Sequence, residues 1–395
     1  MKWALAFLLS AAGCAARAGD AATDAGATHD ASAAAPGDGG DVPSLVADAS
    51  QADSLVDPSG PQRLGPALGG PYPLLSDYRL FTGDPALQVP SPGVLPYEVA
   101  APLWSDHARK HRFLVLPPGE VAAPTPDDTW ALPVGTILVK TFGFAESLDD
   151  PDSPELLVET RLLIHEDRPS GPTWGAYVYL WTEDQSDAVR LDGGTIVKVS
   201  YSRDAQALET PYVVPNTNQC VDCHALHKVA RPIGITTRQL ARQVKRGEQV
   251  VDQLAWLAAQ GALMVPPQGE GLADPYGDGP VEPRARAWLD ANCGHCHRDG
   301  GSGGPSGLSL LASESDPARY GVCKPPVAAG PGTGGRHHDI VPGDPDASIL
   351  VYRIASTSPA VKMPEIPNLL VDEPGISLIR DWISAMPPQD CGPTP

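Results

Sequence analysis

Two short cysteine motifs place the strongest constraint on how this chain can fold. The segment CVDCH spans Cys220–His224, and CGHCH spans Cys293–His297, about 70 positions later. With 7 Cys and 10 His in 395 residues, roughly 0.003 matches to Cys-x-x-Cys-His are expected by chance. Two matches in one chain therefore indicate a shared chemical purpose, and the fold must present both motifs to the groups that they bind.

Four kinds of site use cysteines at this spacing. A redox-active pair needs a helix N-terminus in a βαβ setting, which neither motif has. A zinc site could use the four cysteines, but neither zinc nor a plain disulfide requires a histidine directly after each pair. Covalent haem attachment requires all three residues, because both thiols add to the haem vinyl groups and the histidine ligates the iron. The motifs therefore favour two c-type haems.

The two motifs supply the candidate site residues. Haem attachment is predicted at Cys220, Cys223, Cys293 and Cys296, and proximal iron ligation at His224 and His297. His295 occupies a free position of its motif, so no ligand role is expected for it. Each proximal imidazole should donate its second N–H to a backbone carbonyl. Residues 231–234 and 303–307 follow the motifs at a suitable distance to supply those carbonyls.

Few methionines are available as ligands on the far side of each iron. Met363, in VKMPEIP, precedes a proline that keeps it in a loop, and we predict that it ligates the iron bound to His297. Met264, in GALMVPP, is the corresponding candidate for the haem on His224. A histidine from elsewhere and an open iron are the alternatives there, and an open iron could bind peroxide.

The N-terminus reads MKWALAFLLSAAGC, with Lys2 before an apolar stretch. This pattern resembles a bacterial lipoprotein signal that is cleaved before Cys14, which would then carry lipid; an ordinary secretory signal is the alternative. Either signal exports the chain, and we expect the periplasm and an anchor in the outer membrane. In such an oxidising compartment, the remaining Cys323 and Cys391 are predicted to form a disulfide.

Outside the two motifs, the pattern of apolar residues changes along the chain. Short β-branched and apolar runs between residues 112 and 201 predict strands, among them 135–144, 155–166 and 174–181. Apolar spacing after Cys220 predicts helices at 236–261, 282–293 and 376–386. We therefore predict a multidomain α+β chain: an all-β, sandwich-like domain followed by α-helical cytochrome c-type haem modules. The expected parts are a signal peptide (1–13), an Ala/Gly/Asp-rich disordered tether (14–68), the β-rich domain (69–215), the first haem module (216–275) and the second haem module (276–395).

The chain carries a formal net charge of −20, from 28 basic and 48 acidic residues. Such a charge repels the phosphates of nucleic acid and the headgroups of anionic lipids. It would suit a cationic protein partner instead. We therefore expect redox partner proteins, a membrane contact through the lipid anchor alone, and no nucleic acid.

The C-terminal third resembles a class I cytochrome c domain, in the order ARAWLDANCGHCHRDGG, IVPGDPDASILVYRI, VKMPEIP and LIRDWI. From about residue 70 to 391, the chain is similar to an uncharacterised family of dihaem c-type cytochrome lipoproteins of Gram-negative bacteria. Within the β-rich region, PLWSDHARKHRFLVLPPG and LPVGTILVKTF carry this similarity. The resemblance implies haem binding and electron transfer, without indicating a substrate.

These observations together predict a periplasm-facing dihaem cytochrome with two covalently bound haem c groups. It would pass electrons between partner proteins, as a carrier more than as an enzyme. One alternative is an enzyme of the dihaem peroxidase type, in which one haem keeps an open iron. Another is a haem-based redox sensor whose β domain is a binding module.

Overall fold

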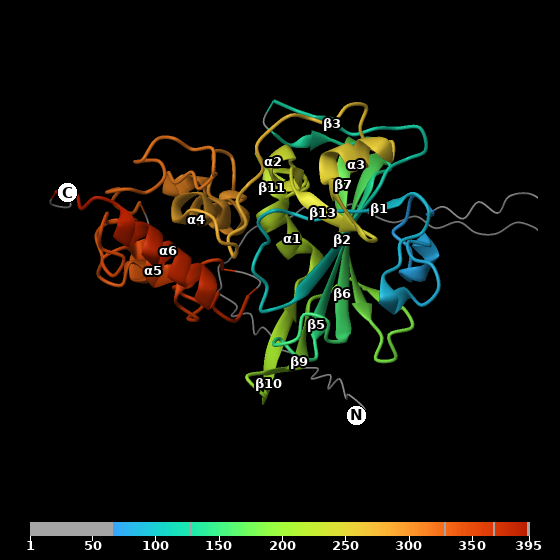
Figure 1. The fold of residues 1–395 in the computed structure, drawn as a ribbon, viewed down its shortest axis with the longest axis horizontal. Coiled ribbons are helices and arrows are strands. Elements are labelled where there is room, and N and C mark those ends of the chain that lie inside the picture. The colour runs from blue at the N-terminus through green and yellow to red at the C-terminus, as the bar shows by residue number, and fades with distance from the viewer. Residues whose placement is uncertain (1–65, 127, 328, 366–367, 393–395) are drawn as a thin grey trace, which may run out of the picture. The chain divides into compact units, whose positions relative to one another are not determined.

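An antiparallel six-stranded sheet forms the largest element of the structure (Figure 1). This computed structural model describes residues 66–126, 128–327, 329–365 and 368–392. The strand order in the sheet is β1-β2-β5-β6-β7-β8. The strands are β1 (Val94–Pro96), β2 (Arg109–Val115), β3 (Ala123–Pro124), β4 (Trp130–Ala131), β5 (Ile137–Ala145), β6 (Glu155–Arg168), β7 (Gly171–Trp181), β8 (Ala188–Leu191), β9 (Thr195–Arg203), β10 (Gln206–Val214), β11 (Ala225–Leu226), β12 (Val229–Ala230), β13 (Gln243–Arg246) and β14 (Gln249–Asp252).

The helices are short and lie between or after the strands. They are α1 (Thr217–His224), α2 (Thr237–Leu240), α3 (Gln253–Ala259), α4 (Val281–Leu289), α5 (Ile349–Ile354) and α6 (Glu373–Ala385). Within the described ranges, no helix is long and apolar enough to cross a membrane.

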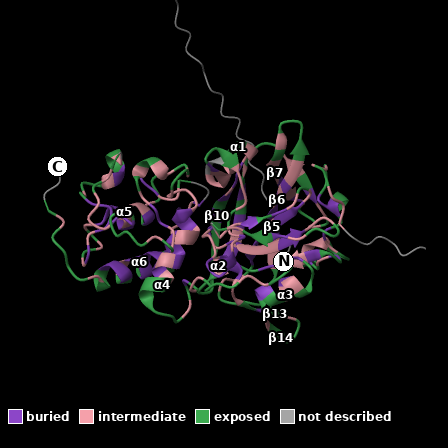
Figure 2. Ribbon diagram, turned by 90° about the horizontal axis from the view of Figure 1, so that it is seen from above, coloured by how far each residue is buried: buried purple, intermediate pink, exposed green. Residues whose placement is uncertain are grey.

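Both faces of the central sheet are buried, because its strands carry apolar residues at consecutive positions. Phe113, Val139 and Leu162 lie opposite one another on β2, β5 and β6 and pack together on one face. Leu114 and Leu138 form the next row along, so their side chains point to the other face. Figure 2 shows this burial in purple along β5 and β6.

The second face of the sheet is covered in two separate places. At one end, Leu138 packs with Leu240 and Leu257 from the α2 and α3 region. At the other end, Phe142 and Val178 pack against the β9–β10 hairpin. Between these two apolar clusters, α1 and β12 approach β7. The helix that carries the first cysteine motif therefore lies over the middle of this face.

The prediction of α-helical haem modules is wrong. After α1, the first predicted module forms the small hairpins β11–β12 and β13–β14, with α2 and α3 of four and seven residues. The second contains α4, α5 and α6, of 9, 6 and 13 residues, joined by long irregular segments. The described chain is mostly β, with helices as short additions.

The segment between α2 and α3 shows why helical spacing was misleading. Val244 and Val251 are seven positions apart, which suits two turns of a helix, but they also lie opposite each other in the β13–β14 hairpin. The two-residue turn begins at Gly247, whose φ of +62° belongs to the left-handed region that favours glycine. The segment therefore forms a hairpin with alternating side chains, although its apolar residues also have helical spacing.

Two predictions concern the ends of the chain. The sulfur atoms of Cys323 and Cys391 lie 2.01 Å apart, so the predicted disulfide is confirmed. It ties the C-terminal segment to the long segment between α4 and α5. Cys14, the predicted signal peptide and most of the predicted tether lie outside the described residues.

Candidate functional site

Helix α1 presents the first motif at its C-terminal end. Its N-terminus is fixed by a reciprocal capping box: the Asn216 side chain accepts from the Gln219 N–H, and the Gln219 side chain accepts from the Asn216 N–H, both at 2.9 Å. The cap sets where the helix begins, so Cys220, Cys223 and His224 fall in its last five residues.

The hydrogen bond of His224 fixes its tautomer. Nδ1 of His224 lies 3.1 Å from the backbone carbonyl oxygen of Arg231. A carbonyl oxygen only accepts, so Nδ1 carries the hydrogen and Nε2 keeps its lone pair. Burial lowers the pKa of His224 to about 4, although the Arg231 contact raises it. The imidazole is therefore neutral at neutral pH, the form that binds metals, and the predicted carbonyl within residues 231–234 is confirmed.

The second motif follows α4 through a π-helical turn, Asp290–Gly294. Such turns are frequent at functional sites. Asn292, which is 1% exposed, holds this turn in place: its Nδ2 donates to the Trp288 carbonyl at 2.9 Å, and its Oδ1 accepts from the Trp104 N–H at 2.8 Å. The second motif is thereby tied to the segment that leads into the central sheet.

His297 is held in the same way as His224, but by a hydroxyl. Its Nδ1 lies 3.1 Å from Ser306 Oγ, and that hydroxyl donates its only hydrogen to the Gly303 carbonyl at 2.6 Å. Nδ1 must therefore donate to Ser306, which leaves the lone pair on Nε2. The predicted segment 303–307 supplies the partner, although the acceptor is a side chain and not a backbone carbonyl. A Cβ at Gly303 would lie only 2.9 Å from Nδ1, so glycine permits this close approach.

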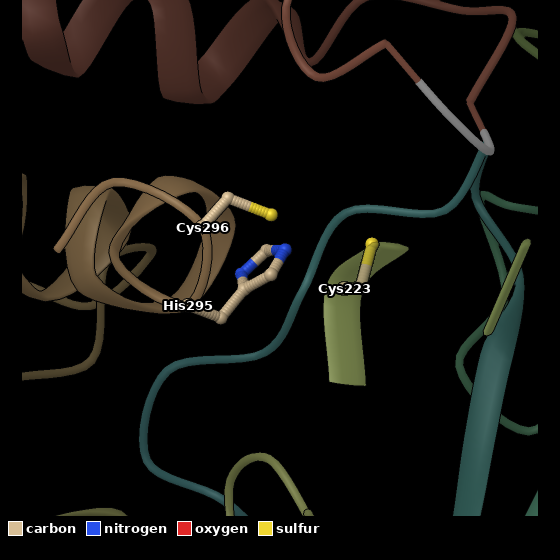
Figure 3. A group of neighbouring side chains, drawn as sticks. All are labelled: Cys223, His295 and Cys296. Atoms are coloured by element: carbon tan, nitrogen blue, oxygen red, sulfur yellow. The ribbon is translucent and has the colours of Figure 1, made fainter. Parts of the chain in front are cut away.

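The fold brings the two motifs together. One ring nitrogen of His295 and the sulfur atoms of Cys223 and Cys296 lie within 4.8 Å of one another. Figure 3 shows Cys223 on one side of a shared space and His295 with Cys296 on the other. Nδ1 of His295 is buried without a hydrogen-bond partner. This cluster could not be predicted from a local sequence pattern, because it depends on the contact between two distant segments.

The two cysteines of the second motif have opposite environments. Cys293 is 8% exposed and packs in the apolar cluster of α4 and α6, where burial raises the pKa of its thiol to about 12. Cys296 faces the other motif, and its hydrogen bond with Cys223 lowers its pKa. One thiol of the pair thus points into the core beside α4, and the other points to the space between the motifs.

A cavity adjoins the first motif. It is lined by Cys220, Cys223 and His224, by apolar side chains of the central sheet such as Leu138 and Leu163, and by His295 from the second motif. Charged side chains also line it, and a cofactor pocket typically combines apolar walls with convergent polar groups. The first motif therefore opens on a space between the sheet and the second motif.

The loops that follow the two motifs also meet. The His227 N–H donates to the Gly300 carbonyl at 2.8 Å. A Cβ at Gly300 would lie 2.3 Å from the His227 ring, so this contact leaves no space for a larger residue. The motifs are therefore held together by their backbones as well as by the thiol cluster.

The loop of Met363 lies in the neighbourhood of His297. The Met363 N–H donates to the Arg353 carbonyl at 3.1 Å, at the end of α5. Burial lowers the pKa of His297 first, Arg353 lowers it further, and Glu365 raises it. Arg353 and Glu365 are thus within electrostatic reach of His297.

Met264 is placed differently from its predicted role. Leu263 is 3% exposed and belongs to the same apolar cluster as Leu257 of α3, and the next residue, Met264, points outward. Met264 is 84% exposed and does not line the cavity that contains His224. The structure therefore does not bring Met264 to the first motif.

Comparison with protein-family models, with curated proteins and with solved structures found no match for this chain.

Proposed function

We propose that the protein is a dihaem c-type cytochrome that transfers electrons. One observation carries this proposal: the histidine after each cysteine pair is held through Nδ1 by an acceptor, Arg231 O or Ser306 Oγ. Each Nε2 is left as the ligating nitrogen, which is how a proximal haem ligand is oriented. A fortuitous cysteine pair has no reason to fix the adjacent imidazole in this way, and here it occurs twice.

The donor set fits covalent haem. Each thiol would add across one vinyl group, with a bond forming between sulfur and one vinyl carbon and the hydrogen passing to the other carbon. Cys220 and Cys223 would hold one haem, and Cys293 and Cys296 the other. Bound haem supplies a one-electron iron couple. The chain itself orients the imidazoles and lines the first pocket with apolar side chains that exclude water.

The proximity of Cys223 and Cys296 favours exchange of electrons within the molecule, since the two attachment sites adjoin. We further propose that lipid on Cys14 anchors the chain, facing the periplasm, at the outer membrane. Its redox partners would be proteins, and the net charge of −20 favours a cationic surface on such a partner.

A metal ion in the cluster of Cys223, His295 and Cys296 is the second candidate, and their convergence within 4.8 Å favours it. Structural zinc takes four protein ligands, and the cluster offers three among the described residues. A metal ion in this cluster would not involve His224 or His297, although the Nδ1 atom of each is held by a hydrogen bond.

Redox titration of motif variants tests the proposed function. The mature protein should show two one-electron steps, and Cys220→Ala/Cys223→Ala or Cys293→Ala/Cys296→Ala should each retain one. The control is Cys323→Ala/Cys391→Ala, which also removes two cysteines but should keep both steps. A mature protein that binds zinc and shows no one-electron step would refute the proposal.

A further inference from the structure

Three basic residues form a row across the central sheet. Arg112 on β2 lies directly opposite Lys140 on β5, and Lys140 lies directly opposite Arg161 on β6. Residues that face each other across neighbouring strands share one face of the sheet, and like charges in such positions destabilise it. The row therefore needs a source of negative charge nearby.

Among the described residues, one of the three forms an ion pair. Glu159 is fully buried and binds Arg161 through both carboxylate oxygens, at 2.9 and 2.5 Å. In the described part of the chain, neither Lys140 nor Arg112 forms an ion pair; Lys140 rests over the Phe142 ring at 4.8 Å. Burial first, and then Arg112 and Arg161, hold the pKa of Lys140 well below its usual range. Among the described residues, these two cations thus have no directly paired carboxylate, although Glu159 raises the pKa of Lys140 and Glu98 raises that of Arg112.

The row faces the first cysteine motif. Arg112, Lys140 and Arg161 line the same cavity as Cys220 and His224. On the second face of the sheet, the row lies between the apolar cluster that contains Leu138 and Leu257 and the apolar cluster that contains Phe142 and Val178. The other charged residues that line this cavity are Arg231, Arg238, Asp290 and Arg298, of which Arg238 and Asp290 pair at 3.3 Å.

We propose that Arg112 and Lys140 bind the propionate carboxylates of the haem attached at Cys220 and Cys223. This inference rests on the proposed function. A haem carries two propionates, which matches the two cations that form no ion pair among the described residues. The propionates lie on the edge of the porphyrin opposite the vinyl groups. Arg161 lines the same cavity as Cys220, and the row extends from it to Arg112 two strands away, about 10 Å at the usual strand spacing.

The central β-sheet would then take part in binding the first haem. Strands β2, β5 and β6 would form one wall of the first haem pocket and neutralise its anionic edge. Positive charge beside a haem favours the reduced iron, which carries one positive charge less. The row should therefore raise the reduction potential of the first haem and keep its propionates ionised.

Lys140→Met in the mature holoprotein tests this role, with Arg112→Gln as an independent second variant. Removing an unpaired buried charge should not prevent folding. Either variant should keep two haems and shift the reduction equilibrium of one haem about tenfold toward the oxidised form, which is about 59 mV for one electron. The pH-linked step in that potential should move to higher pH. Lys140→Arg should restore both properties, and Lys245→Met, an exposed lysine on β13, should change neither.

The outcomes separate the two proposals. Two haems with unchanged potentials and an unchanged pH profile in both Lys140→Met and Arg112→Gln would overturn the propionate site and leave the cytochrome standing. A mature protein without covalent haem would overturn both.

Discussion

Replacing Met363 with Ala is expected to lower the reduction potential of one haem by about 120 mV or more, a hundredfold change in its reduction equilibrium. Thioether ligation raises the potential of a haem, and its loss exposes the iron to water or to a stronger donor. Met363 is half-buried in a loop whose neighbours, Arg353 and Glu365, act electrostatically on His297. The change should therefore affect the haem of the second motif alone.

Optical and EPR redox titrations measure this effect, and Met264→Ala provides the matched control. Met264 also lies shortly before a proline, but it is 84% exposed, so its removal should leave both haem spectra and both potentials unchanged. A normal spectrum in Met363→Ala, or a spectral change in Met264→Ala, would disprove the assignment of the ligand.

Replacing Glu159 with Gln is expected to destabilise the fold by about 3–5 kcal/mol. The Glu159 carboxylate is fully buried and accepts from Arg161 and, at 2.7 Å, from the Tyr212 hydroxyl. Its neutralisation would leave Arg161 as a third unpaired cation in the row with Lys140. The free energy of unfolding of the holoprotein, from urea titration, measures the loss.

The control for Glu159 is a solvated ion pair on a neighbouring hairpin. Glu209 on β10 pairs with Lys198 on β9 with about half of each side chain exposed, so Glu209→Gln should not change the stability measurably. Equal losses in the two variants would show that burial of the Glu159 pair is not the source of its effect.

The strands of the central sheet could be predicted from the sequence because their local signals agree with the fold. The predicted runs at 135–144, 155–166 and 174–181 correspond to β5, β6 and β7, which are rich in β-branched and aromatic residues. Strand β10 was not predicted. It contains Pro211 and several exposed polar residues, and its pairing with β9 comes from the hairpin as a whole.

The helical half of the fold was predicted less well. The helices α4 and α6 correspond to predicted segments, because their apolar residues recur at helical spacing. Between α1 and α3, apolar residues also occur at helical spacing, but there they belong to the β13–β14 hairpin. Apolar residues seven positions apart do not distinguish a helix from a hairpin with a two-residue turn.

The residues of the candidate site could be predicted from the sequence, but their arrangement in space could not. The spacing of cysteine and histidine singled out both motifs, and the segment after Cys220 contained the carbonyl of Arg231. The contact between the motifs and the row from Arg112 to Arg161 depend on long-range packing and on strand register. Neither can be read from a local pattern, although basic residues within predicted strands, such as Lys140, were a signal that could have been noticed.

The mass and absorption of the mature, full-length protein after denaturation test the central claim most directly. Thioether bonds survive unfolding, so two haems should remain attached to each chain, and the pyridine haemochrome spectrum should give the same number. A correctly matured, folded chain that releases all of its haem on denaturation, or that contains none, would contradict this account.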